Sequence, residues 1–438
     1  MALGRNTIHK LGKRIREAYG DGSGPISEND LHMLQEYRLT YRDSIASVFK
    51  ILYEISKRID AQSIVTYRIK RINSIVEKLK RFPTTALDQM IDIAGCRCIS
   101  NDVESVYKII EELRGNPQIV INDIKDYIKV PQPEGYRSVH LYVALKEGDK
   151  KSIEIQLRTR EQHDWATLVE ISDVIIPESK LKEYDEPKDL WEFHRILSIP
   201  EDEITDKERN VYFKVLRKYD YINRLQKIFL QNTFIRHQWL NTKISIIKNF
   251  FLIEAGVDNK TKISCYQTFK EAEEAYFERF IQDSNANLVL TQIQNVTFEQ
   301  LTVAYSNYVL STHTFTTDCI NRFIKEMRLS MRKRDLDRYS KALDSYLNII
   351  AHQIIHINQE IYTLNKSRTL KIDPKQREWL KDLQKQVAQL MSRKDRHKTL
   401  YRETEMYKAN IITRMRFSIC AKTIARKYEN LVQQHVPS

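Results

Sequence analysis

Apolar and polar positions alternate along this chain with two different periods, and the period separates predicted helices from predicted strands. Apolar residues that recur every three or four positions predict helices, whereas strict alternation predicts strands. The helical period covers residues 1–19, about 28–60, 66–81 and 102–114, and most of the chain from 160 onward. Short apolar or alternating runs predict strands at 90–99, 118–129, 138–146 and 152–158. These elements predict an α+β fold, with a mixed β-sheet flanked by helices.

Two helix ends can also be predicted. Ser27 is a suitable N-cap, with Asp30 three residues later in the first turn, where a negative charge favours the helix dipole. The helix over 102–114 should stop at Gly115.

The second half of the chain contains two regions with different hydrophobic patterns. Strands predicted at 244–247 and 286–290, with a helix over 268–283 between them, indicate a small α+β unit that continues through 301–308. Residues 326–430 are long, charged and helical, and Pro374 interrupts them, which predicts a helical hairpin. Its isoleucine ladder is typical of a core or a dimer seam: Ile349, Ile350, Ile354, Ile355 and Ile357. The predicted domains are helical support at 1–60, a sheet domain at 61–205, the small α+β unit at 206–325 and a helical region at 326–438.

The strand at 152–158 carries the first candidate chemistry. Apolar positions 153, 155 and 157 alternate with Glu154, Gln156 and Arg158, so a carboxylate, an amide and a guanidinium share one face. A half-solvated strand with mixed charges has the same pattern.

A helix over 66–81 would stack Lys70, Ser74, Lys78 and Arg81 on one side. This side could line a polyphosphate, and the alternative is a solvated basic face.

The apolar run at 90–99 contains one carboxylate, Asp92, whose presence in a buried strand calls for a reason such as a Mg²⁺ ion. Asp92 and Arg97 would point to opposite faces of a straight strand. If both serve one site, a bulge at Gly95 is expected.

Composition narrows the possible partners. The 438 residues include 71 Lys and Arg against 58 Asp and Glu, a net charge of +13. This excess favours polyanions such as nucleotides, RNA or an acidic protein, although a solvated basic surface is the alternative. The five cysteines are odd in number and are most simply reduced thiols. Without a signal-like or membrane-spanning apolar run, the expectation is a cytoplasmic protein with no membrane association.

Several separated blocks resemble the synthetase domain of the RelA/SpoT family over roughly residues 60–200. The blocks are Arg68 to Ile75, Asp92-Ile93-Ala94-Gly95-Cys96-Arg97, Asp126-Tyr127-Ile128, Gly135-Tyr136-Arg137-Ser138-Val139-His140 and Glu154-Ile155-Gln156-Leu157-Arg158-Thr159. The resemblance implies a nucleotidyltransferase-like sheet. It also implies an enzyme that transfers pyrophosphate from ATP to the 3' hydroxyl of GDP or GTP, making the alarmones ppGpp and pppGpp. The hydrolase motifs of bifunctional members are absent, so a single-function long form is expected.

The resemblance also implies roles for individual residues. Asp92 and Glu154 would hold Mg²⁺ and be the catalytic carboxylates, with Glu154 either the base or only a ligand. The ATP-binding set would be Arg68 and Arg97 on the adenine, with Lys70, Ser74, Lys78 and Arg81 on the phosphates. The acceptor-binding set would be Lys125, Tyr136, Gln156, Arg158, His140 and His163, in which Tyr136 stacks on the guanine.

One position departs from the family pattern. Most members have a lysine after the residue equivalent to Pro131, and this chain has Gln132, a neutral amide that cannot replace a cation beside phosphate. Either Lys129 or Arg137 substitutes for that lysine, or the acceptor is different. Toxin-type relatives that pyrophosphorylate the 3' end of tRNA or make adenosine alarmones are therefore an alternative. An inactive nucleotide-binding module is a further one.

The C-terminal helices have no predicted chemistry. Their length and charge suggest that they regulate the synthetase, form a homo-oligomer or bind a regulatory partner.

Overall fold

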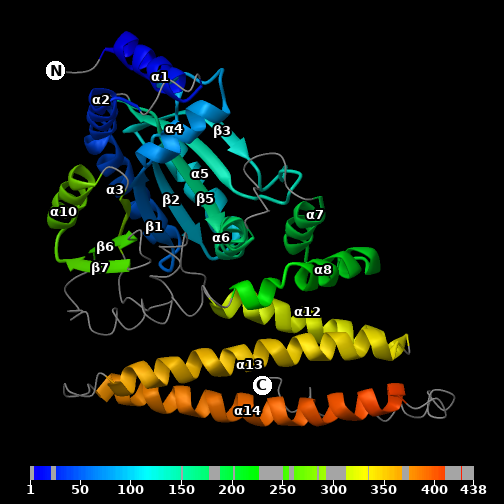
Figure 1. The fold of residues 1–438 in the computed structure, drawn as a ribbon. Helices are drawn as coiled ribbons and strands as arrows, with labels where there is room; N and C mark the ends of the chain where they lie inside the picture. The colour runs from blue at the N-terminus through cyan, green and yellow to red at the C-terminus, as the bar shows by residue number, and fades with distance from the viewer. Residues whose placement is uncertain are drawn as a thin grey trace. The chain divides into compact units, whose positions relative to one another are not determined.

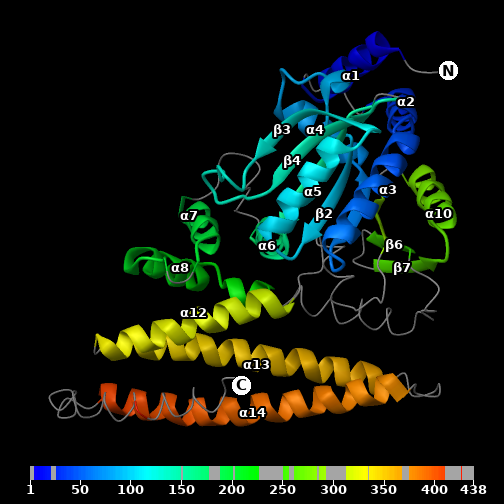
Figure 2. The same cartoon turned by 180° about the vertical axis from the view of Figure 1, so that it is seen from behind.

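The structure is a computed structural model that describes residues 4–20, 26–148, 151–176, 188–200, 203–225, 250–255, 261–283, 286–292, 312–333, 335–366, 374–409 and 426. The chain divides into two compact units (Figures 1 and 2). The first comprises residues 1–219 and 241–310, and the second comprises 220–240 and 311–438. Within the described ranges, no helix has the length and hydropathy needed to cross a membrane. The four-part division made from the sequence stays a prediction.

The first unit combines helices with one continuous sheet. Its helices are α1 (Arg5–Gly20), α2 (Glu28–Leu39), α3 (Arg42–Ile59), α4 (Ile72–Arg81), η1 (Leu87–Gln89), α5 (Val103–Gly115), α6 (Arg160–Ile175), α7 (Lys188–Leu197), α8 (Asp206–Lys218) and α10 (Phe269–Gln282). Its strands are β1 (Ile64–Ile69), β2 (Ala94–Ser100), β3 (Ile119–Asp126), β4 (Val139–Leu145), β5 (Ile153–Thr159), β6 (Phe250–Ala255), β7 (Thr261–Tyr266) and β8 (Asn287–Gln292). The predicted N-cap is confirmed, because the Ser27 side chain accepts a hydrogen bond from the Asp30 backbone N–H.

The eight strands form a mixed sheet in the order β3-β4-β5-β2-β1-β8-β6-β7. Only the β2–β5 pair is parallel among these strands, and the other neighbours are antiparallel. The fold class predicted from the sequence, an α+β protein with a mixed sheet and flanking helices, is therefore confirmed.

The predicted alternation gives this sheet two chemically different faces. One face buries Cys96, Cys98, Ile155 and Leu157, and α3 and α5 cover it (Figure 2). Both cysteines are free thiols, as expected. Because side chains alternate along a strand, Glu154 and Gln156 belong to the opposite face. The apolar half of the pattern thus fixes where the polar half must point.

The helix predicted over 66–81 begins too early. Residues 64–69 form β1, and the helix α4 starts only at Ile72. The segment Ile64 to Ile69 is rich in β-branched residues and pairs along its whole length with β2, and this pairing overrides the local helical spacing.

The bulge predicted at Gly95 is also wrong. Gly95 pairs regularly with Arg68 on one side and Glu154 on the other. Asp92 lies in a turn before β2 rather than inside the strand. Its position is therefore not tied to the alternation of side chains along the strand, and no bulge is required.

Three strands from residues 250–292 extend the sheet beyond β1. The predicted helix over 268–283 and strand over 286–290 are confirmed as α10 and β8. β8 pairs with β1, and the Thr291 hydroxyl donates to the Val65 carbonyl at 2.9 Å. The strand predicted at 244–247 and the segment 301–308 lie outside the described residues.

The second unit contains the helices α12 (Thr312–Arg332), α13 (Leu336–Lys366) and α14 (Pro374–Ala409). α13 packs against both α12 and α14, and Pro374 begins α14, so the predicted hairpin is confirmed. Ile349, Ile350 and Ile354 are buried, whereas Ile355 is exposed.

Candidate active site

The polar face of the sheet aligns the predicted site residues in two rows across neighbouring strands. Strand pairing places Lys125 opposite His140, His140 opposite Gln156, and Gln156 beside Arg97. Directly opposite residues share a face. The same argument puts Tyr142, Glu154 and Arg68 in a second row. Residues from β1 to β5 that are far apart in sequence therefore meet on one surface.

Glu154 lies at the centre of this surface, with both carboxylate oxygens oriented by side chains. His140 Nδ1 is 3.0 Å from Oε1, and Gln156 Nε2 donates to Oε2 at 3.1 Å. Burial alone would raise the pKa of Glu154, but the hydrogen bond and charge of His140 and the hydrogen bond from Gln156 together outweigh burial, so the pKa lies below its usual value. Glu154 is therefore a fixed carboxylate that stays ionised.

Asp92 is the second carboxylate, held by two lysines. Lys70 Nζ and Lys78 Nζ lie 2.6 and 2.7 Å from the same oxygen, Oδ2. Burial alone would raise the pKa of Asp92, but the charges of Lys70 and Lys78 outweigh burial and leave the pKa below its usual value. The predicted association of these lysines with the site thus has a direct geometric counterpart, although Lys70 precedes α4 rather than belonging to it.

The two carboxylates fit a divalent cation. The other Asp92 oxygen, Oδ1, is buried without a hydrogen-bond partner, and an ionised buried acceptor of this kind is suited to a hard cation. Asp92 and Glu154 are close enough for their charges to interact. Gly95 lies directly beside Glu154, since a Cβ there would stand 3.3 Å from the Glu154 carbonyl oxygen and 3.9 Å from Oε2.

Three guanidinium groups add positive charge to the same surface. Arg97 and Arg158 interact electrostatically with each other and with Arg68, and burial together with these neighbours lowers the pKa of Arg97. Arg97 Nε donates to Gln156 at 3.4 Å. Arg158 Nη2 lies 2.6 Å from His163 Nδ1, so the ring nitrogen accepts and both residues are buried. The charge of Glu170 acts on both Arg97 and Arg158 and offsets part of this repulsion.

The loop before β4 presents Tyr136. Its hydroxyl is 2.8 Å from His140 Nε2, and its ring centroid is 6.3 Å from that of Trp165. The preceding Gly135 has a φ of +100°, and a Cβ there would stand 2.6 Å from Ser198 Cβ. Only glycine satisfies both the backbone and the space at this position. Residues just after α7 thus support the loop.

Other predicted residues lie at the rim. Arg68, Arg81 and Lys125 are exposed, and Ser74 is half-buried on α4. The Lys125 ammonium lies 5.4 Å from the Tyr142 ring centroid.

Lys129 contacts residues outside the loop that precedes β4, which we call the acceptor loop after its predicted role. Its Nζ is 3.7 Å from Asp126 and 5.0 Å from the Tyr107 ring centroid on α5. It is therefore a poor substitute for the missing lysine at position 132. Arg137 has a buried Nε without a partner.

Sequence reasoning missed three aromatic residues. Tyr142 pairs directly across the sheet with Glu154, the Tyr127 ring packs edge-on against His140, and Trp165 lies beside Tyr136. Tyr142 could have been found by the period of two, because it follows His140 by two positions. The contacts of Tyr127 and Trp165 depend on tertiary packing, which no local sequence pattern predicts.

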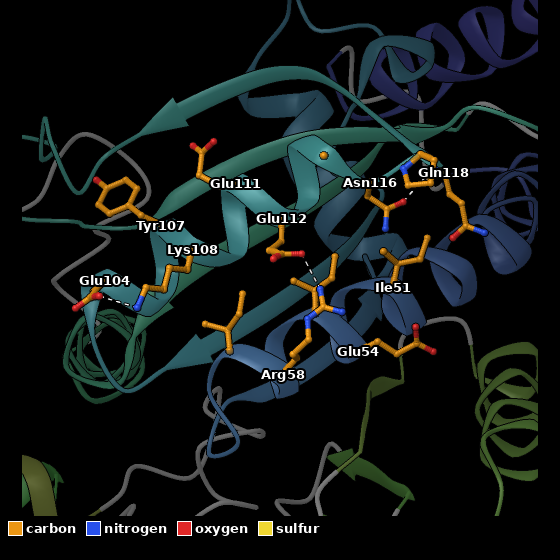
Figure 3. A pocket seen from close by; sticks show the side chains of 14 residues that line it. Ile51, Glu54, Arg58, Glu104, Tyr107, Lys108, Glu111, Glu112, Asn116 and Gln118 are labelled. Atoms are coloured by element: carbon orange, nitrogen blue, oxygen red, sulfur yellow. Dashed lines mark hydrogen bonds and ion pairs between the residues drawn. The ribbon is translucent and has the colours of Figure 1, made fainter.

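A groove of about 930 Å³ lies on the opposite side, between α3 and α5 (Figure 3). Two ion pairs join side chains that line it: Arg58 with Glu112 at 2.7 Å and Lys108 with Glu104 at 2.6 Å. The ionised carboxylates of Asp92 and Glu154, and the lysine and arginine side chains around them, belong to the other face of the sheet.

Comparison with known proteins finds the same family that the sequence motifs resemble. The family described as a region found in RelA / SpoT proteins matches residues 67–172. GTP pyrophosphokinase YjbM of Bacillus subtilis is 31% identical over 147 residues, which cover 31% of this chain and 70% of that protein. GTP pyrophosphokinase YwaC of the same organism is 35% identical over 111 residues, which cover 23% of this chain and 53% of that protein. The chain thus spans about half the length of YwaC.

Among solved structures, small alarmone synthetase 1 from Bacillus subtilis bound to its product pppGpp is 24% identical. The match covers 38% of this chain and 90% of that chain, with a TM-score of 0.34.

Proposed function

The chain belongs to the RelA/SpoT family, and from this premise we propose that it is an ATP pyrophosphokinase that acts on GDP or GTP. The 3' oxygen of the acceptor attacks the β phosphorus of ATP, the bond between the α and β phosphates breaks, and AMP leaves. The products are ppGpp or pppGpp. The observation that carries the proposal is the pair of ionised carboxylates, Asp92 and Glu154, set among cations on one face of the sheet.

The chain's own residues supply positioning and electrostatics, which provide most of the catalysis in phosphoryl transfer. Lys70 and Lys78 bind the phosphates of ATP, assisted by Ser74 and Arg81, while Arg68 and Arg97 hold the adenine. The support for this role is that both lysines lie at Asp92, the carboxylate that would hold the cation beside those phosphates.

On the acceptor side, Tyr136 stacks on the guanine, Lys125 meets the phosphates and Gln156 contacts the ribose. Arg158 and His163 support this side through their mutual hydrogen bond. Glu154 accepts the proton of the 3' hydroxyl. Asp92 and Glu154 are the residues that would hold Mg²⁺, which would supply charge neutralisation at the transferred phosphates.

Gln132 favours a second candidate, a toxin-type enzyme that pyrophosphorylates the tRNA 3' end or makes adenosine alarmones. Because Lys129 is engaged with Asp126, the acceptor loop has one cation fewer than the usual pattern. The net charge of +13 suits RNA equally well. The ionised carboxylates argue against the third candidate, an inactive module, which would be free to lose them.

The test is transfer of label from ATP labelled at the γ phosphate, with Mg²⁺ and with GDP, GTP, ATP or bulk tRNA as separate acceptors. Label on a guanine nucleotide supports the first proposal, and label on tRNA or on an adenosine product with two more phosphates than the acceptor supports the second. Glu154→Gln is the control, because it keeps the shape of the side chain and removes the charge. Transfer that survives this substitution would show that the carboxylate is not catalytic.

A further inference from the structure

One imidazole contacts both the stacking ring and the central carboxylate of the site. His140 Nε2 is 2.8 Å from the Tyr136 hydroxyl, and Nδ1 is 3.0 Å from Glu154 Oε1. The side chains of His140 and Glu154 are each only 13% exposed. Building on the proposed function, we propose that His140 is a positioning residue that couples the base-stacking Tyr136 to the catalytic Glu154.

The histidine ring is held in place by aromatic neighbours. The Tyr127 and Tyr136 rings stand perpendicular to it, with centroids 5.3 and 5.7 Å away and interplanar angles of 89° and 90°. A ring packed on two sides in this way has little freedom to leave its rotamer. Its two nitrogens therefore point at fixed positions.

The direction of each hydrogen bond follows from the chemistry of the partners. An ionised carboxylate only accepts, so Nδ1 of His140 donates to Glu154. In the neutral ring, Nε2 then accepts the proton of the Tyr136 hydroxyl. The hydroxyl of the stacking residue and the carboxylate oxygen are thus oriented by the same ring.

The chain of contacts continues beyond the carboxylate. Gln156 donates to Glu154 Oε2 and accepts from Arg97 Nε. A continuous path of hydrogen bonds runs from Tyr136 on the acceptor loop to Arg97 on β2. Placing the guanine on Tyr136 consequently fixes the carboxylate relative to both substrates, which is what in-line transfer requires.

Two substitutions separate the two contacts. An asparagine at position 140 places an amide near the Nδ1 position and cannot reach Tyr136. A glutamine places its amide near the Nε2 position and leaves Glu154 without this partner. Tyr136→Phe keeps the stacking ring and removes only the hydroxyl. His32→Asn, at an exposed position on α2, is the control for histidine replacement.

Two readouts are measured for each variant: kcat with saturating substrates, and the affinity for a fluorescent GDP analogue without Mg²⁺. For His140→Gln we expect kcat to fall about tenfold or more with affinity within about threefold, since one hydrogen bond to a charged group is lost. His140→Asn should weaken GDP binding by about threefold to tenfold and retain most of kcat, and Tyr136→Phe should behave in the same way.

Equal effects of His140→Asn and His140→Gln on both readouts would overturn the proposal. A loss of GDP affinity in both variants with kcat unchanged would instead indicate a direct contact between His140 and the acceptor.

A third readout does not depend on activity. In ¹H–¹⁵N spectra of histidine-labelled protein, we expect His140 to carry its proton on Nδ1 and its Nε2 signal to shift in Tyr136→Phe. A proton on Nε2, with no response to Tyr136→Phe or Glu154→Gln, would exclude the bridge. If the wild type transfers pyrophosphate to no acceptor while the spectra show the bridge, the proposed function fails and the coupling stands as a structural contact.

Discussion

At the scale of single residues, the shared oxygen of Asp92 is the most specific electrostatic feature. Lys70, just before α4, and Lys78, on α4, meet at Oδ2 within 2.7 Å. Two ammonium groups this close repel one another, so an arrangement with both at one oxygen is favourable chiefly when more negative charge arrives. In the proposed reaction, the polyphosphate of ATP would supply this charge.

We therefore predict that Lys78→Met raises KM for ATP about tenfold, equivalent to about 1.4 kcal/mol, and leaves KM for the acceptor unchanged. Initial rates at varied ATP and at varied GDP measure the two constants. Lys80→Met is the matched control, since Lys80 is an exposed lysine of the same helix. If both variants weaken ATP equally, the effect is that of net charge, and the contact at Asp92 is irrelevant.

At the scale of elements, the acceptor loop rests on the end of α7. Gly135 and Gly148 both have positive φ, at +100° and +82°, but only Gly135 has a neighbour that an added Cβ would strike, the Ser198 side chain. Gly148 has open space around it. Substituting alanine at each of the two glycines therefore distinguishes the effect of backbone strain from the effect of displacing the loop.

Gly135→Ala should raise KM for the acceptor tenfold or more, about 1.4 kcal/mol, with KM for ATP unchanged, because the loop that carries Tyr136 must move. Gly148→Ala should cost about 1 kcal/mol of stability from backbone strain and leave both constants unchanged. Steady-state kinetics and urea unfolding provide the measurements. Unaltered acceptor binding in Gly135→Ala would mean that α7 does not position the loop.

The junction of α7 with α8 should be sensitive to acid. Arg195 and the N-cap Thr205 lower the pKa of Glu208 to about 2, and Glu208 completes a capping box at the start of α8. A carboxyl whose pKa is lower in the folded state stabilises the fold above its unfolded pKa of about 4.5, and this stabilisation is lost as pH falls toward 2.

Glu208→Gln should therefore lower the free energy of unfolding at pH 7 by about 1 kcal/mol, a figure reduced for solvent screening of a surface pair. The difference from wild type should shrink as pH falls from about 4.5 toward 2. Urea unfolding of both proteins across this range is the measurement. A difference that is independent of pH would assign the effect to the lost cap geometry and not to the charge.

How much of this was predictable differs between elements. The alternation at 152–158 located β5 and the face of Glu154, because burial acts on each residue of a strand separately. The same reasoning misplaced residues 66–71, since the pairing of β1 with β2 is a long-range event that no local period records. Asp92 and Glu154 could be singled out by residue type and resemblance. The position of His140 between Tyr136 and Glu154 depends on the register of β4 with β5, which the local sequence pattern does not predict.

At the scale of the whole molecule, the continuity of the sheet decides where the chain can be divided. β8 covers the edge of β1, and the Tyr276 hydroxyl accepts a hydrogen bond from the Ile69 backbone N–H at 3.0 Å. Tyr276, Phe277 and Phe280 of α10 are buried in the same core. Residues 250–292 thus contribute to the strand that carries Arg68, and a test of the C-terminal region has to leave them in place.

A chain truncated after residue 310 should keep the first unit and its synthetase activity, whereas one truncated after residue 205 should aggregate or lose cooperative unfolding. Each buried aromatic side chain that is lost costs about 3–5 kcal/mol, so the loss of three is comparable to the whole stability of an ordinary domain, and β1 becomes an open edge. Solubility, urea unfolding and pyrophosphate transfer are compared with the full chain. If the chain truncated after residue 310 differs in activity from the full chain, the result supports regulation by the helical region. Equal activity and equal regulation in the two chains would refute such regulation. A folded, active chain ending at residue 205 would instead show that the added strands are dispensable to the site.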